Sequence, residues 1–278
     1  MRSLRLKILA LAALLVVLTQ VGTIGALLFT ASHEVEQRIR SDLATAGTVL
    51  DRAMKLHSDR LREAMGDLAR NPEFLRADAM GNRPLLAREL LRSMAQADAG
   101  LAVVLGPDGR VLAATGSALR LPERLPDVVQ IAAGHHSARG VFEAAGATYH
   151  VTTLALRGPG GRPFGWLAAG FALDDARAGR IAAFGGQDIA FVTGWGSSLR
   201  LAGTSLPGID LAGIRAQLAA AATTTGTTVE ARIRDTSYIV AHKALVPGKT
   251  DAQVLLFQSM EQALAPYRML RWSALGVG

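Results

Sequence analysis

The fold is decided by residues 101–115, which read LAVVLGPDGRVLAAT. Two apolar runs, residues 101–105 and 110–115, have the composition of buried strands and flank the turn sequence GPDG at residues 106–109. Pro-Asp-Gly favours a tight turn, because proline presets one backbone angle and glycine accepts the positive φ that many turns require. The stretch therefore predicts an antiparallel hairpin, and with it a sheet.

The same pattern returns 89 positions further along the chain. Three short matches share this offset: residues 111–115 with 200–204, Thr148-Tyr149 with Ser237-Tyr238, and Ala155-Leu156 with Ala244-Leu245. A fixed offset between equivalent segments is the signature of an internal repeat. We interpret it as a tandem duplication of one α+β module, consisting of a helix, a hairpin, a second helix and three antiparallel strands.

The rest of the first module follows from its periodicity. Helices are predicted at residues 84–97, before the hairpin, and at 125–133, after it. Three strands are then predicted at residues 140–144, 148–156 and 164–172.

A long helix is predicted at residues 32–70, because neither proline nor a turn cluster interrupts this segment before Asn71-Pro72. Its apolar residues recur at spacings of three and four and form a seam: Val35, Ile39, Leu43, Ala46, Leu50, Ala53 and Met54. The seam can pack on its own domain or on a second copy of the chain. A homodimer is the assembly we expect.

The uncharged run at residues 8–31 is longer than the roughly 20 residues that a membrane-spanning helix needs. Arg2, Arg5 and Lys7 precede it, so residues 1–7 are expected in the cytoplasm. The alternative is a cleaved signal peptide, although such peptides have a shorter apolar core. The sequence predicts a retained anchor that continues into the long stalk helix.

The end of the chain predicts a second contact with the membrane. Within residues 267–278, Arg268, Arg271 and Trp272 suit a membrane interface. We interpret this segment as the start of a second transmembrane helix, and a chain that only touches the membrane again is the alternative. Residues 32–266 would then lie in the periplasm of a bacterium, on the outer side of the inner membrane, in a single-pass or double-pass protein.

Composition narrows the function. The net charge is +7, yet all 23 acidic residues lie between Glu34 and Glu261, so the basic surplus is at the membrane flanks and the exterior part is nearly neutral. There is no basic stripe interleaved with aromatic residues, and nucleic acid is not an expected partner. The chain has no cysteine, which excludes disulfides and thiolate metal sites and fits a periplasmic protein held by core burial.

The whole arrangement resembles the double-Cache sensors of bacterial transmembrane receptors, which contain two tandem PAS-like modules. The hairpin segments 101–115 and 188–204 carry this resemblance, together with the exit FALDD at residues 171–175 and the ending FQSMEQALAPY at residues 257–267. It implies an α+β fold, with a transmembrane helix, a stalk helix and two Cache-like modules whose antiparallel sheets are flanked by helices. The modules would be membrane-distal (residues 71–177) and membrane-proximal (residues 178–266).

The function that the resemblance implies is ligand sensing for a missing cytoplasmic output domain: a histidine kinase, a nucleotide or diguanylate cyclase, or a chemoreceptor signalling helix. A small molecule or a periplasmic protein would be the ligand, and the distal module would bind it. The amino-acid-binding members have an aromatic-rich signature before the first strand; residues 84–97 contain Arg88 and Arg92 but no aromatic residue, so an amino-acid ligand is not predicted. The alternative is a membrane-anchored periplasmic scaffold protein without signalling output.

Candidate ligand-binding residues are polar or aromatic side chains on the apolar strands of the first module: Arg139, Tyr149, His150 and Trp166. Arg139 can bind an anion in a bidentate manner, and Trp166 can form a pocket wall. No catalytic residue, no metal site and no cofactor are predicted. His135-His136 has no carboxylate partner placed by the sequence, and no nucleophile and base stand at a catalytic spacing, so this region is not expected to be an enzyme.

Overall fold

The computed structural model describes most of the chain. The described residues are 2–116, 121–132, 137–157, 161, 163–194, 198–209, 211–215, 228–246 and 252–263. Within the first range, the side chains of residues 2–18 and 21–34 lie outside the description.

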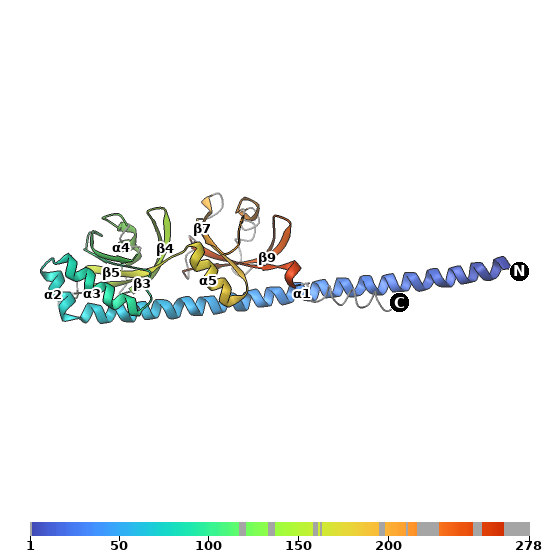
Figure 1. Ribbon diagram of the computed structural model, residues 1–278, viewed down its shortest axis with the longest axis horizontal. Coiled ribbons are helices and arrows are strands. Elements are labelled where there is room, and N and C mark those ends of the chain that lie inside the picture. The colour runs from blue at the N-terminus through green and yellow to red at the C-terminus, as the bar shows by residue number, and fades with distance from the viewer. Residues whose placement is uncertain are drawn as a thin grey trace.

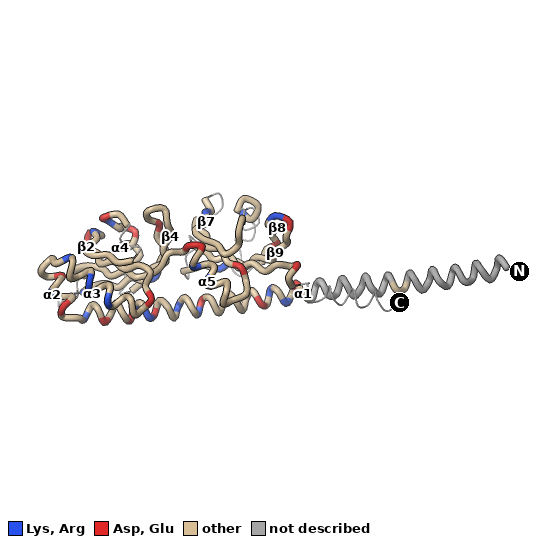
Figure 2. Tube along the Cα trace, in the orientation of Figure 1, with Lys and Arg blue, Asp and Glu red and all other residues tan. Residues whose placement is uncertain are grey.

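The N-terminal helix α1 (Arg2–Arg70) is a single helix of 69 residues, and its described part lies along one side of both sheets (Figure 1). It ends where the sequence predicted, directly before Asn71-Pro72. Basic and acidic residues alternate along the part of α1 that lies beside the sheets (Figure 2), and some form pairs one turn apart, such as Arg62 with Asp59 at 2.9 Å. Helix α1 is therefore the element that the two halves of the molecule share.

No helix has a stretch long and apolar enough to cross a membrane among the residues whose side chains are described. The predicted anchor at residues 8–31 lies outside that set, apart from Thr19 and Gln20, and the predicted second span at residues 267–278 lies outside the described residues.

Ten strands form two five-stranded antiparallel sheets, of order β2-β1-β5-β4-β3 and β7-β6-β10-β9-β8. The first sheet contains β1 (Leu101–Leu105), β2 (Val111–Gly116), β3 (Ser137–Ala144), β4 (Ala147–Arg157) and β5 (Pro163–Ala172). The second contains β6 (Asp188–Thr193), β7 (Arg200–Thr204), β8 (Thr228–Ile233), β9 (Thr236–Ala244) and β10 (Ala252–Ser259). The two orders are equivalent, which confirms two tandem modules of one α+β design.

The hairpin that opened the sequence argument forms as predicted. Strand β1 pairs with β2, and the amide of Gly109 donates to the carbonyl of Gly106 at 3.0 Å to close the turn. Gly109 has a φ of +77°, the left-handed conformation for which the turn needs glycine.

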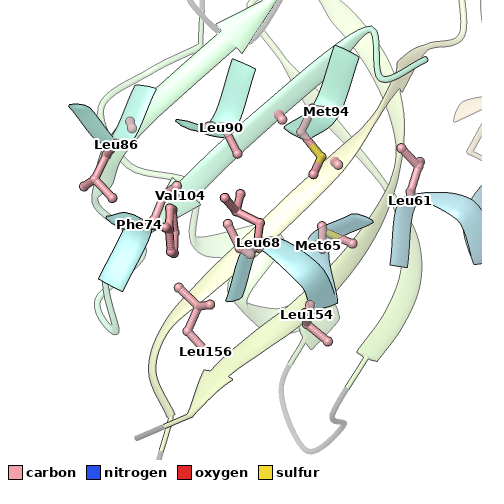
Figure 3. Packing of buried hydrophobic residues seen from close by; sticks show 14 of the residues in the cluster. Leu61, Met65, Leu68, Phe74, Leu86, Leu90, Met94, Val104, Leu154 and Leu156 are labelled. Carbon is pink, nitrogen blue, oxygen red and sulfur yellow. The ribbon is translucent and has the colours of Figure 1, made fainter. Parts of the chain in front are cut away.

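Four shorter helices complete the fold: α2 (Pro72–Ala79), α3 (Arg83–Gln96), α4 (Pro126–Ala132) and α5 (Asp175–Gly185). Helix α2 was not predicted, although Asn71 caps it through a 2.8 Å bond from the Glu73 amide and Pro72 occupies its first turn. The helices α1, α2 and α3 bury a common core against one face of the first sheet (Figure 3), and α4 covers the other face.

The sequence left open whether the seam of α1 packs on its own domain or on a second copy of the chain, and the structure decides between the two. Val35, Ile39, Leu43, Leu50 and Met54 are buried against the second sheet, in one cluster with residues of β6, β9 and β10. The seam therefore packs on the chain's own second module. Lys243 of β9 reinforces this contact, since its Nζ lies 3.0 Å from the carbonyl oxygen of Gly47 and 3.2 Å from Oδ2 of Asp51.

The two modules touch directly at Glu143, near the end of β3. Its carboxylate accepts hydrogen bonds from the Thr193 hydroxyl at 2.8 Å and the Arg200 guanidinium at 2.6 Å. Both Glu143 and Arg200 are well exposed, so the pair is a weak surface contact that orients the modules more than it stabilises them.

Removing this contact should change stability little. We expect Glu143→Ala to lower the free energy of unfolding by less than about 1 kcal/mol, because water competes for both charges. A double-mutant cycle with Arg200→Ala, measured by urea denaturation, should give a coupling of about 0.2–1 kcal/mol. A coupling of zero would show that the pair does not persist in solution.

Candidate functional site

A cavity of about 580 Å³ lies between α1 and α5, next to the last residues of β5 and to strands β6 and β10 of the second sheet. We call it the junction cavity. Its walls are mainly apolar, and its polar lining residues are Asp42, Thr45, His57, Arg177 and Gln187. Its size is in the range of small-molecule sites, which are concave and mostly apolar with a few polar groups.

Local sequence explains how the two helices line this cavity. On α1, the lining residues Ala46, Leu50, Ala53 and His57 are spaced by three and four positions, so they share one helix face. Helix α5 begins after Asp174, whose carboxylate accepts from the amide of Arg177 at 2.8 Å. That cap sets Arg177 in the first turn, and Ile181 and Phe184 follow on the same side.

Phe171, at the end of β5, organises the polar end of the cavity. The guanidinium carbon of Arg177 lies 4.1 Å from the centre of its ring, a cation–π contact. The ring of His57 meets it edge-on at 5.2 Å, and the ring of His150 stacks on it at 5.4 Å. His57 and Arg177 line the cavity, and His150 belongs to the sheet face toward α1, in contact with the same aromatic ring.

The charge at this end is the guanidinium of Arg177, which lies over the Phe171 ring that both imidazoles also contact. Burial, and then the charge of Arg177, lower the pKa of His57, and burial lowers the pKa of His150 to about 4. Burial also lowers the pKa of Arg177, but an arginine stays charged at any ordinary pH. Within the described part of the chain, Arg177 forms no ion pair within 4.0 Å.

Unpaired buried polar atoms concentrate in the same place. Eight such side-chain atoms occur in the described residues, and six of them belong to His57, Ser58, His150, Thr152 and Arg177. Buried polar atoms nearly always have hydrogen-bond partners in folded proteins, so a local cluster of exceptions requires an explanation. A binding function for this region is one such explanation.

The four residues predicted from the sequence lie on two faces of the first sheet. Tyr149 and Trp166 are buried on the α4 face, where the Tyr149 ring stacks on Phe142 at 5.3 Å. His150 lies on the opposite face, toward α1. Arg139 lies on that face too, since its strand partner Thr152 is two residues from His150, and its charge contributes to the low pKa of His150. The structure therefore brings Arg139 and His150 together, but not with the other two.

Sequence reasoning missed His57, Phe171 and Arg177 as site residues. One signal was present: Ser58 is buried on the seam of α1 between Met54 and Leu61, where the periodicity demands an apolar residue. His135-His136 lies outside the described residues. Among those residues that are described, no group of three His, Asp or Glu side chains could hold a metal ion.

No protein-family model and no curated protein sequence matches the chain. Solved structures do. The periplasmic domain of Vibrio cholerae LuxQ is similar, with a TM-score of 0.53 and 15% identity over 78% of this chain and 99% of that one. The ligand-binding domain of the Campylobacter jejuni chemoreceptor Tlp3, in complex with 4-methylisoleucine, has a TM-score of 0.57 and 12% identity. This match covers 84% of this chain and 93% of that one. A domain of a putative sensory box/GGDEF family protein from Vibrio parahaemolyticus has a TM-score of 0.58 and 10% identity. This match covers 84% of this chain and 98% of that one. At such identities the likeness shows the fold, and that fold is the pair of tandem α+β modules that the sequence predicted.

Proposed function

We propose that the chain is the extracytoplasmic sensing region of a transmembrane signal-transduction receptor, whose cytoplasmic output domain is a kinase, a cyclase or a chemoreceptor signalling helix. One observation carries the proposal: a single helix, α1, contributes to the cores of both modules and also forms a wall of the junction cavity. The likeness to periplasmic sensor domains supports it. The region itself would bind a ligand and relay the signal to the output domain, without catalysing a reaction.

The proposed topology follows the charge pattern of the sequence. Residues 1–7 are cytoplasmic and residues 8–31 span the bacterial inner membrane. Residues 71–177 form the membrane-distal module, residues 178–266 the membrane-proximal one, and residues 267–278 begin a second span.

Signal relay requires two states that a ligand binds unequally. The core of the second module offers a route to the membrane, because Met260 and Ala263, after β10, pack on the same cluster as Val35 and Ile39 of α1. A small shift of α1 in the junction cavity would reach this point through the buried seam. Both segments that lead toward the proposed spans would then move relative to each other.

The proposed partners are a small molecule and a second copy of the chain. The Tlp3 domain binds 4-methylisoleucine, a small molecule with an apolar side chain, which supports a small organic ligand here. Leu56 of α1 is 55% exposed and lies outside the junction cavity, and this exposed apolar side chain supports a homodimer through α1.

The proposal is tested by joining residues 1–278, through a completed second span, to the output domain of a well-characterised receptor in a bacterial host. We expect at least one compound in a metabolite panel to change the output. We also expect Ala263→Phe to shift the basal output several-fold, because the added ring would enter the cavity that Ala263 shares with Val35 and Ile39 and change how this segment packs on α1. The matched control is Glu261→Phe, at an exposed position of the same turn.

An unchanged output in every condition, from a folded and membrane-inserted chimera, would contradict the sensor proposal and favour a membrane-anchored scaffold.

A further inference from the structure

The walls of the junction cavity fit an aliphatic chain. Leu50 and Met54 of α1, Ile181 of α5 and Leu256 of β10 all line it, and all four side chains are apolar. A ligand body buried here gains about 25 cal/mol for each Å² of apolar surface removed from water. Sugars and other polyhydroxylated ligands would lose their hydrogen bonds to water against such walls.

The polar end of the cavity fits a single carboxylate. The Nε atom of Arg177 is buried without a hydrogen-bond partner, and Nε2 of His57 is in the same condition. Arg177 also forms no ion pair among the described residues. Burial and then the charge of Arg180 lower its pKa, and Asp98 and Asp174 act in the opposite direction. A guanidinium presents two parallel N–H donors that match the two oxygens of a carboxylate.

Charge selects against the other ligand classes. A cationic ligand would meet Arg177, and a neutral one would leave its guanidinium unpaired in a half-buried site. A second anionic group would have to lie against the apolar walls or close to Asp42, which lines the cavity 15 residues earlier on α1, roughly 22 Å from His57.

We propose that the junction cavity binds an amphipathic monocarboxylate, whose carboxylate pairs with Arg177 and His57 and whose aliphatic chain lies along Leu50, Met54 and Ile181. Such a ligand bridges α1 to α5, the first helix of the second module, and so couples the two modules. The biological meaning of this site rests on the proposed sensor function, but its binding chemistry does not.

The test uses the full chain in lipid nanodiscs and follows methionine methyl resonances by NMR during titration with octanoate. Met54 lines the cavity and reports on binding, and Met80 is 68% exposed at the far end of the molecule and serves as an internal reference. We expect octanoate to shift the Met54 signal saturably and leave Met80 unchanged. Octanol lacks the charge and acetate lacks the chain. Each should bind more weakly than octanoate by a factor of about ten or more.

Two variants locate the head and the chain of the ligand. Arg177→Met keeps the length of the side chain and removes the charge, and it should weaken octanoate binding about tenfold or more. Arg180→Met is the matched control at an exposed position one turn further along α5, and it should change the affinity by no more than about twofold, although the Arg180 charge also acts on Arg177. Ile181→Glu places a carboxylate in the apolar wall and should abolish binding, which keeps the proposal testable if Arg177→Met does not fold.

Equal affinity for octanol and octanoate, an unshifted Met54, or an unaffected Ile181→Glu would each overturn the proposal. If the octanoate experiments fail but the receptor chimera still responds to another compound, only the proposed ligand class is overturned. Octanoate binding beside an unresponsive chimera would instead contradict the sensor function.

Discussion

Replacing Phe74 with alanine is expected to lower the free energy of unfolding by about 3–5 kcal/mol. The Phe74 side chain is 0% exposed and belongs to the core in which α1, α2, α3 and the first sheet meet (Figure 3). Alanine would leave a cavity in the layer that contains Leu68 and Leu86. Domains of this kind are stable by only about 5–15 kcal/mol, so a large part of the total would be lost.

Urea denaturation of the full chain measures this loss as a lower midpoint with an unchanged slope. Leu75→Ala is the matched control, because Leu75 is the next residue of the same helix and is 39% exposed. It should cost well under half as much as Phe74→Ala. Similar losses for both variants would mean that α2 is not docked as described.

The site of Phe74 also shows where sequence reasoning stopped. Asn71-Pro72 was interpreted only as the end of the long helix, although the same two residues begin α2, with asparagine as cap and proline in the first turn. The segment has eight residues, too few for a clear periodic signal. Longer elements were predictable: the hairpin, the stalk helix and the strands of the first sheet all follow from local patterns that the structure confirms.

The order of elements along the second module was predictable for a different reason. The repeat at an offset of 89 transferred the first module's plan to a half with weaker signals of its own. Strands β7 and β9 contain the matching segments 200–204 and 237–238 in places equivalent to those of β2 and β4. An internal repeat therefore carries information about the plan of the second module that its own periodicity lacks.

Only part of the candidate site could be predicted from the sequence. Tyr149 and His150 are adjacent in a strand, so they must face opposite sides of the sheet, and a shared pocket was already excluded by strand geometry. The approach of His57, Phe171 and Arg177 could not be deduced in this way. His57 lies 114 residues before Phe171, and only the packing of α1 against α5 and the end of β5 brings it to Phe171 and Arg177, which are six residues apart.

Acid is expected to destabilise the protein through His150, which is 1% exposed and whose pKa is lowered to about 4, first by burial and then by the charge of Arg139. In the unfolded chain this pKa is about 6.5. The unfolded state therefore binds the proton more readily, so stability rises with pH in this range. The contribution of a neutral, buried His150 is fully present above pH 6.5 and is lost as the pH falls from about 6.5 to about 4.

The size of this effect follows from the difference between the two pKa values. It amounts to about 2 kcal/mol by pH 5 and about 3 kcal/mol below pH 4. Burial also lowers the pKa of His57 and His242, so these residues act in the same direction. Urea denaturation between pH 7.5 and pH 5 measures the slope above the range in which most carboxylates titrate.

His150→Leu separates the contribution of His150 from the others. Leucine has a similar volume and removes two buried nitrogens that have no hydrogen-bond partner, so stability at pH 7.5 should be unchanged or higher. The variant should lose most of the decline toward pH 5 and keep the part that belongs to His57 and His242. A full decline in the variant would place the titrating group elsewhere.

The His150 ring stacks on Phe171, and the guanidinium of Arg177 lies on the same ring. A proton on His150 would therefore add a second positive charge around Phe171. Acid should loosen the contact between the sheet and α5 before it unfolds the cores.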